Sequence, residues 1–189
     1  MSRIQPVVLI RKYYANYPEA FGILLEHSRK VTRRAVIIAR HCRRHGEEVD
    51  LQFIAEAAML HDIGILFTDT PELGCPGKGS YLLHGIKGAR LLRHEKLPKH
   101  ARVCERHIGV GLTAKEIRKQ RLPLPQRDMC PETLEEQIIC YADLFYSKGK
   151  KNRHREKQPD EIRKKLKKYG HAKIRIFDQW LERFEPHLD

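Results

Sequence analysis

The chain has 189 residues, of which 41% are hydrophobic, so it is long enough for one domain with a sizeable core. No apolar run approaches the roughly 20 residues that cross a bilayer, and the N-terminus lacks a signal-peptide pattern, so we expect a cytoplasmic protein with no membrane partner. The net charge of +13 points to anionic partners, but residues 146–175 hold 13 Lys/Arg against three acidic residues, a difference of +10 in one segment. Five scattered cysteines without a Cys-x-x-Cys pair argue against a disulfide framework or a zinc knuckle.

Helical periodicity runs through the whole chain and predicts an all-α fold. In the first third we expect helices over residues 6–14, 18–46 and 50–62. His27 lies on the apolar stripe of the second helix, and the third helix ends in His61-Asp62, which interrupts an apolar run. A buried carboxylate is costly unless a positive group or a metal ion offsets it. The pair therefore needs partners from elsewhere in the chain.

Residues 64–80, which follow this pair, are rich in proline and glycine and predict a loop too irregular for a helix. A loop of this length is uncommon in a compact domain unless it is functional. The next helix carries His84 and then Gly85 and Gly88, which permit close approach to a neighbouring element. Thr133 and Glu136 match a capping box. After residue 80 we expect six helices. They cover residues 81–96 and 98–107, a short stretch that begins at 113, and residues 133–145, 162–166 and 174–184.

The histidines divide by their neighbours in the sequence. Six have Lys or Arg close by and are interpreted as solvated: His41, His45, His94, His100, His154 and His171. Four others, with two aspartates, begin or end apolar helical faces: His27, His61, His84, His107, Asp62 and Asp143. One such histidine is usually a hydrogen-bonded core residue, but six residues on five helices of a compact bundle predict a shared interior metal site.

The order of these six residues resembles the H…HD…D signature of the HD superfamily of metal-dependent phosphohydrolases, with the two further histidines of its binuclear branch. The resemblance covers residues 20–147 and is closest to small stand-alone HDIG-type proteins, and less close to symmetrical diadenosine tetraphosphate hydrolases. It implies an HD-domain helical bundle over residues 1–147, followed by a basic helical extension over 148–189. The Gly-Tyr-Pro motif of cyclic-di-GMP phosphodiesterases is absent, which disfavours that substrate.

The resemblance also implies roles for individual residues. Asp62 would bridge two divalent transition metals (iron, manganese, cobalt, nickel or zinc), with one site completed by His27, His61 and Asp143 and the other by His84 and His107. The metals would activate a hydroxide that cleaves a phosphate ester or anhydride of a small, nucleotide-like substrate, with Asp62 as a catalytic residue.

Two lysines are candidates for contact with the substrate. Lys87 lies three residues after His84, on nearly the same helical face, and is a candidate catalytic and substrate-binding residue. Lys148, just past the helix of Asp143, is a weaker substrate-binding candidate. The alternative for each is an ordinary solvated lysine.

The basic C-terminal segment has two interpretations. It could bind RNA or another polyanion through phosphate contacts, or its Lys/Arg side chains could form a solvated face while its apolar residues dock onto the core. We favour the solvated face, because the segment lacks a nucleic-acid motif. The alternatives to a binuclear hydrolase are thus a nucleotide- or RNA-binding module with a structural HD metal centre, and a mononuclear nucleotidase. The sequence leaves the oligomeric state open.

Overall fold

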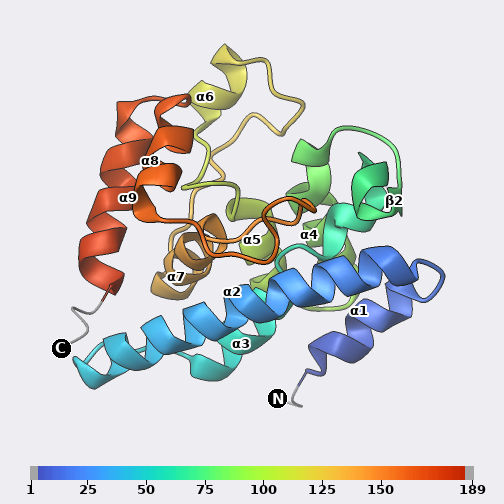
Figure 1. The fold of residues 1–189 in the computed structure, drawn as a ribbon, viewed down its shortest axis with the longest axis horizontal. Helices are drawn as coiled ribbons and strands as arrows, with labels where there is room; N and C mark the ends of the chain where they lie inside the picture. The colour runs from blue at the N-terminus through green and yellow to red at the C-terminus, as the bar shows by residue number, and fades with distance from the viewer. Residues whose placement is uncertain (1–3, 186–189) are drawn as a thin grey trace.

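A computed structural model describes residues 4–185 of the chain, and these form the expected all-α bundle (Figure 1). The predicted helices are all found within this range, with small shifts at their ends. Their bounds are Pro6–Tyr14 (α1), Pro18–Arg44 (α2), Leu51–Leu60 (α3), His84–His94 (α4), Pro98–Arg106 (α5), Ala114–Lys119 (α6), Leu134–Leu144 (α7), Pro159–Lys167 (α8) and His171–Phe184 (α9). Within the same range, no helix is both long and apolar enough to cross a membrane.

The long helix α2 lies across the bundle in Figure 1, and its residues belong to both parts of the core. Pro18 starts it at a position where its missing N–H costs nothing. It ends just before Gly46, whose φ of +87° is a left-handed conformation that suits glycine. Its buried residues recur every three or four positions, as expected for a helix with one face on the core. His27 belongs to that buried face.

The core has two apolar clusters that meet near His27. One cluster joins the second half of α2 to α3, α7, α8 and α9, and the other joins α1 and the first half of α2 to α4 and α5. Helix α3 also crosses from one to the other, because Ala57 and Ala58 belong to the first cluster and Met59 and Leu60 to the second. His61 and Asp62 therefore emerge between the two clusters, where polar groups interrupt the apolar packing.

Helix α4 packs against the turn that follows Asp62, and glycines make this contact as close as the sequence predicted. A Cβ on Gly64 would lie 2.1 Å from the backbone oxygen of His84, and one on Gly88 would lie 3.1 Å from the Gly64 nitrogen. A Cβ on Gly85 would lie 2.5 Å from the Cys104 oxygen of α5. These approaches bring the ends of α3, α4 and α5 together.

The expectation of an irregular loop over residues 64–80 needs a correction. Residues Ile63–Phe67 form a 3-10 helix, Pro71–Leu73 form another, and Asp69–Thr70 (β1) pairs antiparallel with Cys75–Pro76 (β2). Strands of two residues are too short to produce a detectable alternation of apolar and polar residues. The predicted helix over 81–96 also begins as a 3-10 turn, Tyr81–Leu83, before α4.

The predicted capping box at α7 is only half formed. The Thr133 hydroxyl accepts a hydrogen bond from the Glu136 N–H at 3.2 Å, as expected. The Glu136 carboxylate instead accepts from the Glu132 N–H at 2.8 Å and pairs with Arg106 at 3.1 Å. A tertiary ion pair thus redirects a side chain that local geometry would have turned back onto Thr133.

One of the histidines that we interpreted as solvated is buried. His100 is 7% exposed, its ring lies edge-on to Phe53 at 5.0 Å, and its Nε2 lies 3.4 Å from Glu56 on α3. The neighbouring Lys99 does not predict this burial, since adjacent residues on a helix point to different sides.

The C-terminal helices α8 and α9 dock onto the core through apolar side chains, which confirms the packing that we favoured for this segment. Ile162, Leu166, Phe177, Trp180 and Phe184 belong to the same cluster as the second half of α2. The predicted boundary between residues 147 and 148 stays a prediction, since one continuous core lies on both sides of it.

Candidate metal centre

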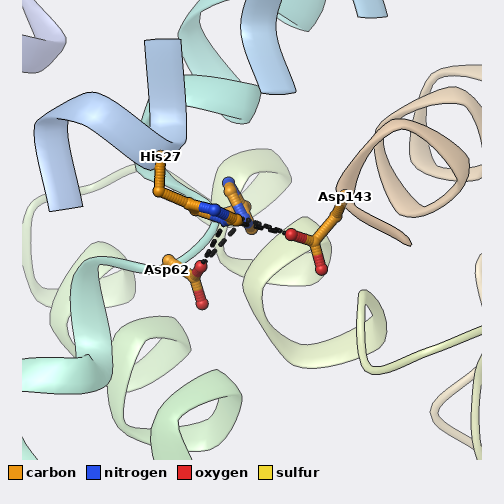
Figure 2. A group of neighbouring side chains, drawn as sticks. His27, Asp62 and Asp143 are labelled. Atoms are coloured by element: carbon orange, nitrogen blue, oxygen red, sulfur yellow. Dashed lines mark hydrogen bonds and ion pairs between the residues drawn. The ribbon is translucent and has the colours of Figure 1, made fainter. Parts of the chain in front are cut away.

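The first half of the centre is formed by residues from α2, the end of α3 and α7 (Figure 2). His27 Nε2 lies 3.1 Å from Asp62 Oδ2 and 3.0 Å from Asp143 Oδ1. His61 Nε2 lies 3.0 Å from Asp62 Oδ2 and 3.5 Å from Asp143 Oδ1. The two imidazole nitrogens are 3.3 Å apart. Two imidazoles and two carboxylates therefore converge on one point.

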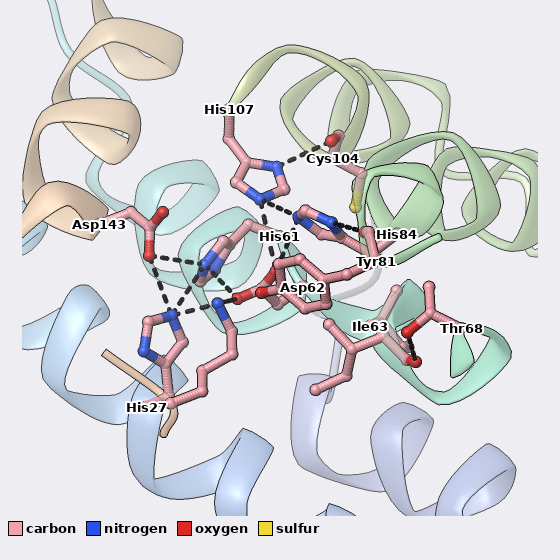
Figure 3. A network of polar contacts seen from close by, with 12 residues as sticks. His27, His61, Asp62, Ile63, Thr68, Tyr81, His84, Cys104, His107 and Asp143 are labelled. Carbon is pink, nitrogen blue, oxygen red and sulfur yellow. Dashed lines mark hydrogen bonds and ion pairs between the residues drawn. The ribbon is translucent and has the colours of Figure 1, made fainter. Parts of the chain in front are cut away.

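The second half uses the other oxygen of the same aspartate (Figure 3). Asp62 Oδ1 lies 3.3 Å from His84 Nε2 and 3.3 Å from His107 Nε2, and these nitrogens are 3.0 Å apart. Asp62 is thus common to both groups of potential metal ligands. The structure brings all six predicted ligands together and gives each oxygen of Asp62 its own pair of histidines.

Three of the histidines are held in the same way by their own helix ends. His61 Nδ1 lies 2.6 Å from the Ala58 oxygen, His84 Nδ1 lies 2.6 Å from the Tyr81 oxygen, and His107 Nδ1 lies 2.8 Å from the Cys104 oxygen. Each carbonyl comes three residues before its histidine. A proton on Nδ1 that is donated to this carbonyl leaves the Nε2 lone pair free to face the centre, as metal-binding histidines require.

The carboxylates of the centre are ionised despite their burial. Burial alone would raise the pKa of Asp62 and Asp143, but the positive charge of Lys148 and contacts with the histidines hold both pKa values well below the ordinary range. Both Asp62 oxygens and Asp143 Oδ1 are buried and accept no hydrogen bond of normal geometry. Buried anionic oxygens without hydrogen bonds are suited to a cation.

One histidine of each half, His61 and His84, has a shifted pKa, and the two shifts are in opposite directions. Burial lowers the pKa of His61, but Asp62 and Asp143 outweigh this effect and raise it to about 10. For His84, burial dominates and lowers the pKa to about 3. The carboxylates thus favour a positive charge at His61, whereas burial favours a neutral His84. Together with the donor types, imidazole and carboxylate, this arrangement fits divalent transition metals rather than calcium.

Lys148 lies directly at the centre, where its ammonium forms an ion pair with Asp62. Its side chain is only 10% exposed. Burial would lower its pKa, but Asp62, with Tyr81 and Asp143, raises it well above the usual value. Lys148 thus supplies positive charge where a metal ion would also offset the buried carboxylate. Its predicted contact with substrate stays a prediction.

Lys87, the other candidate for contact with substrate, lies away from the centre, and its predicted role stays a prediction. Its ammonium donates to the backbone oxygens of Phe67 and Lys78, and it is absent from the lining of the adjacent cavity. Lys87 therefore holds the residue 64–80 segment against α4. Helical spacing correctly put it near His84 along the helix, but the segment packed over α4 takes up its hydrogen bonds.

Sequence reasoning also missed Tyr81, which stacks on the His84 ring with a centroid distance of 4.5 Å and an interplanar angle of 25°. The ring covers His84, while its backbone oxygen holds the same imidazole (Figure 3). The signal that could have identified it is its position three residues before a candidate ligand histidine.

A cavity of about 570 Å³ opens from the centre. His84, His107, Asp143 and Lys148 line one part of it, and the loop after α7 together with α8 lines another. This volume is within the range of sites for small molecules, roughly 300–1,000 Å³. The cavity gives a ligand access to the residues of the metal centre.

Comparison with known proteins gives a family match and several relatives. A model of the family described as HD domain matches residues 24–147. An uncharacterized protein of Methanocaldococcus jannaschii is 37% identical over 124 residues, which are 64% of this chain and 64% of that protein. No solved structure matches.

Two further relatives are named tRNA (cytidine(56)-2′-O)-methyltransferase. The one from Picrophilus torridus is 37% identical over 99 residues, 52% of this chain and 25% of the relative. The one from Thermoplasma volcanium is 32% identical over 158 residues, 83% of this chain and 40% of the relative. The chain thus spans between a quarter and just under two thirds of the length of these three relatives.

Proposed function

Because the chain belongs to the HD domain family, we propose that it is a metal-dependent phosphohydrolase that cleaves a phosphate ester or anhydride of a nucleotide-like substrate. The observation that carries this proposal is the donor set, in which the two oxygens of one buried carboxylate each face a pair of imidazole nitrogens. A single metal site would leave one of these pairs without a cation.

The proposed binuclear site uses two groups that share Asp62. One metal would be held by His27, His61, Asp62 and Asp143, and the other by Asp62, His84 and His107. When bound, such metals supply a hydroxide nucleophile near neutral pH and neutralise charge on phosphoryl oxygens.

The chain's own residues would orient this chemistry. The three backbone carbonyls at Ala58, Tyr81 and Cys104 fix the imidazole rings, so the site needs little rearrangement to bind cations. The buried position of Asp62 keeps water away from the shared carboxylate. The cavity, which His84, His107 and Asp143 line, would hold the substrate next to the metals.

The test combines metal content with hydrolysis. Protein purified with Mn²⁺ should contain close to two metals per chain and release phosphate or a nucleotide from at least one of three groups: mononucleotides, dinucleoside polyphosphates and cyclic nucleotides. His107→Asn should lower both the metal content and the activity, whereas His94→Asn, whose side chain is 84% exposed, should change neither. Metal-loaded protein that hydrolyses none of these compounds would contradict the proposal.

A second candidate function is RNA binding through the basic C-terminal segment. It is favoured by the names of the two relatives, which refer to tRNA, and by three exposed lysines of α8 and its C-cap, Lys164, Lys167 and Lys168. Replacing these three with Gln should weaken tRNA binding and reduce its salt dependence by roughly one unit of slope per lost phosphate contact. Asp62→Ala should leave tRNA binding intact, and a gel-shift assay at two salt concentrations separates the two results.

A further inference from the structure

The cavity next to the metal centre extends to the basic C-terminal segment. Besides His84, His107 and Asp143, its walls include Lys157 from the loop after α7, and Lys165 and Tyr169 from α8 and its end. In Figure 1 this loop crosses the middle of the molecule before it reaches α8. The segment that accounts for most of the net charge thus forms part of the wall of the proposed active site.

Four lysines line the cavity, and two of them are neutralised by carboxylates. Lys148 pairs with Asp62, and the Lys173 ammonium lies 2.8 Å from Glu116 and donates to the Gly111 oxygen at 2.7 Å. Within residues 4–185, the other two lysines, at positions 157 and 165, have no carboxylate at ion-pair distance. The acidic residues of the lining are Glu72, which is exposed, and Asp143, which belongs to the metal centre.

Lys157 lies in the loop before α8, and hydrogen bonds to the end of α7 and the residues just after it fix its position. Its ammonium donates to the backbone oxygens of Leu144 at 2.9 Å and Tyr146 at 3.0 Å, and its backbone N–H donates to Phe145 at 2.9 Å. An ammonium has three N–H groups, so one remains for a ligand. Burial lowers the pKa of Lys157 to about 8, as expected for a cation without a carboxylate partner.

Lys165 is exposed and is free to reach a ligand in the cavity. The neighbouring Lys164 is also exposed but lies outside the cavity lining. The two adjacent lysines therefore differ in position and not in charge, and they form a matched pair for experiment.

A further part of the wall is apolar and suits the nucleoside part of a ligand. Its side chains include Ile108, Val110, Leu112, Ile162 and Leu166, with Tyr169, which is 54% exposed, beside them. An aromatic ring and aliphatic side chains can contact either face of a base without reading its identity. The cavity wall thus combines the metal-centre residues, the two lysines at positions 157 and 165, and an apolar surface. This combination matches a ligand that has an apolar part and more than one phosphate.

We propose that Lys157 and Lys165 form an anion subsite that binds a second phosphate of the nucleotide substrate, apart from the phosphate that reacts at the metal centre. This inference rests on the proposed function, because it assigns the reacting phosphate to the metal residues. The substrate class is accordingly a nucleotide with at least two phosphates, either adjacent or separated by the sugar.

The test measures binding of AMP, ADP and adenosine 3′,5′-bisphosphate, each as a non-hydrolysable phosphonate analogue, to the Mn²⁺-loaded full chain by calorimetry. At least one of the two doubly phosphorylated compounds should bind more tightly than AMP. Lys165→Gln should weaken that binding by about 10-fold, as for loss of one charged hydrogen bond, and should leave AMP binding unchanged. Lys164→Gln should behave as wild type. Lys157→Gln should show the same loss, although it also removes two contacts at the end of α7.

Two results would overturn the subsite: equal affinity for all three compounds, or unchanged affinity of Lys165→Gln for the doubly phosphorylated ones. Hydrolysis by the Mn²⁺-loaded protein is measured separately. If hydrolysis occurs but Lys165→Gln binds as wild type, the subsite is wrong and the proposed function stands. If the lysine effect appears without hydrolysis of any nucleotide, the subsite stands and the proposed reaction is wrong.

Discussion

The shared carboxylate of Asp62 is the most informative position to change, and Asp62→Asn is the least disruptive way to change it. Asn has nearly the same shape but has no charge, and its side chain has one carbonyl oxygen and one amide nitrogen, which is not a metal ligand. In the structure, Oδ2 faces His27 and His61, while Oδ1 faces His84 and His107. Asn can therefore serve only one of the two groups.

The second group depends on Asp62 more than the first does. The first group retains the carboxylate of Asp143, whereas among the described residues Asp62 is the one carboxylate that could join His84 and His107 as a metal ligand. Losing this charge removes most of the electrostatic attraction for a divalent cation. We expect Asp62→Asn to lose the second metal and to bind the first more weakly.

The effect can be measured as metal-dependent thermal stability. At a free metal concentration of roughly 100 times Kd, one site stabilises the folded state by about 2.7 kcal/mol. For a chain of this size that corresponds to a rise in Tm of roughly 5–11 °C. Wild type should show at least this rise when Mn²⁺ is added to protein treated with EDTA, and Asp62→Asn should show less than half of the wild-type rise.

The comparison is made within each variant, with and without Mn²⁺, so any change in metal-free stability cancels. Asp69→Asn, at an exposed position in β1, is the matched control and should respond to Mn²⁺ as wild type does. An undiminished Mn²⁺ response in Asp62→Asn would refute the assignment of Asp62 as the ligand common to both groups.

Two further predictions concern the packing and charge that support the site. Gly64→Ala would place a Cβ 2.1 Å from a backbone oxygen of α4, so we expect a loss of about 3 kcal/mol or more in urea unfolding. Gly22→Ala in α2, with nothing within 4 Å, should not destabilise; equal effects at both glycines would contradict the close packing. Burial would raise the pKa of Glu105, but ion pairs with Arg127 and Arg93 lower it below its usual 4.5. This charge therefore stabilises the fold above about pH 4.5 and less as pH falls further, and Glu105→Gln should flatten that dependence in unfolding measured between neutral and acid pH.

The helices and the identity of the six candidate ligands could be predicted from the sequence because both depend on local pattern. Apolar residues recur at helical spacing along α2, and His27 falls on the same stripe. Asp50 directly precedes α3, and its carboxylate accepts a hydrogen bond from the Phe53 N–H at 2.9 Å. Such features involve residues three or four positions apart, whose relative placement a helix determines by itself.

The partners of each side chain depended on contacts between distant segments. The sequence did not indicate that Lys148 would pair with Asp62, that Lys87 would turn to the carbonyls of Phe67 and Lys78, or that His100 would be buried against Glu56. In each case the deciding neighbour lies on another element, and sequence spacing carries no information about its distance.

By itself, the amino-acid sequence determined that this chain forms helices and carries four histidines and two aspartates on their apolar faces. The tertiary structure decided which oxygen of Asp62 faces each pair of histidines, and that α8 forms a wall of the adjacent cavity. The reason is that periodicity specifies which face of a helix is buried, while only packing between helices specifies what that face meets.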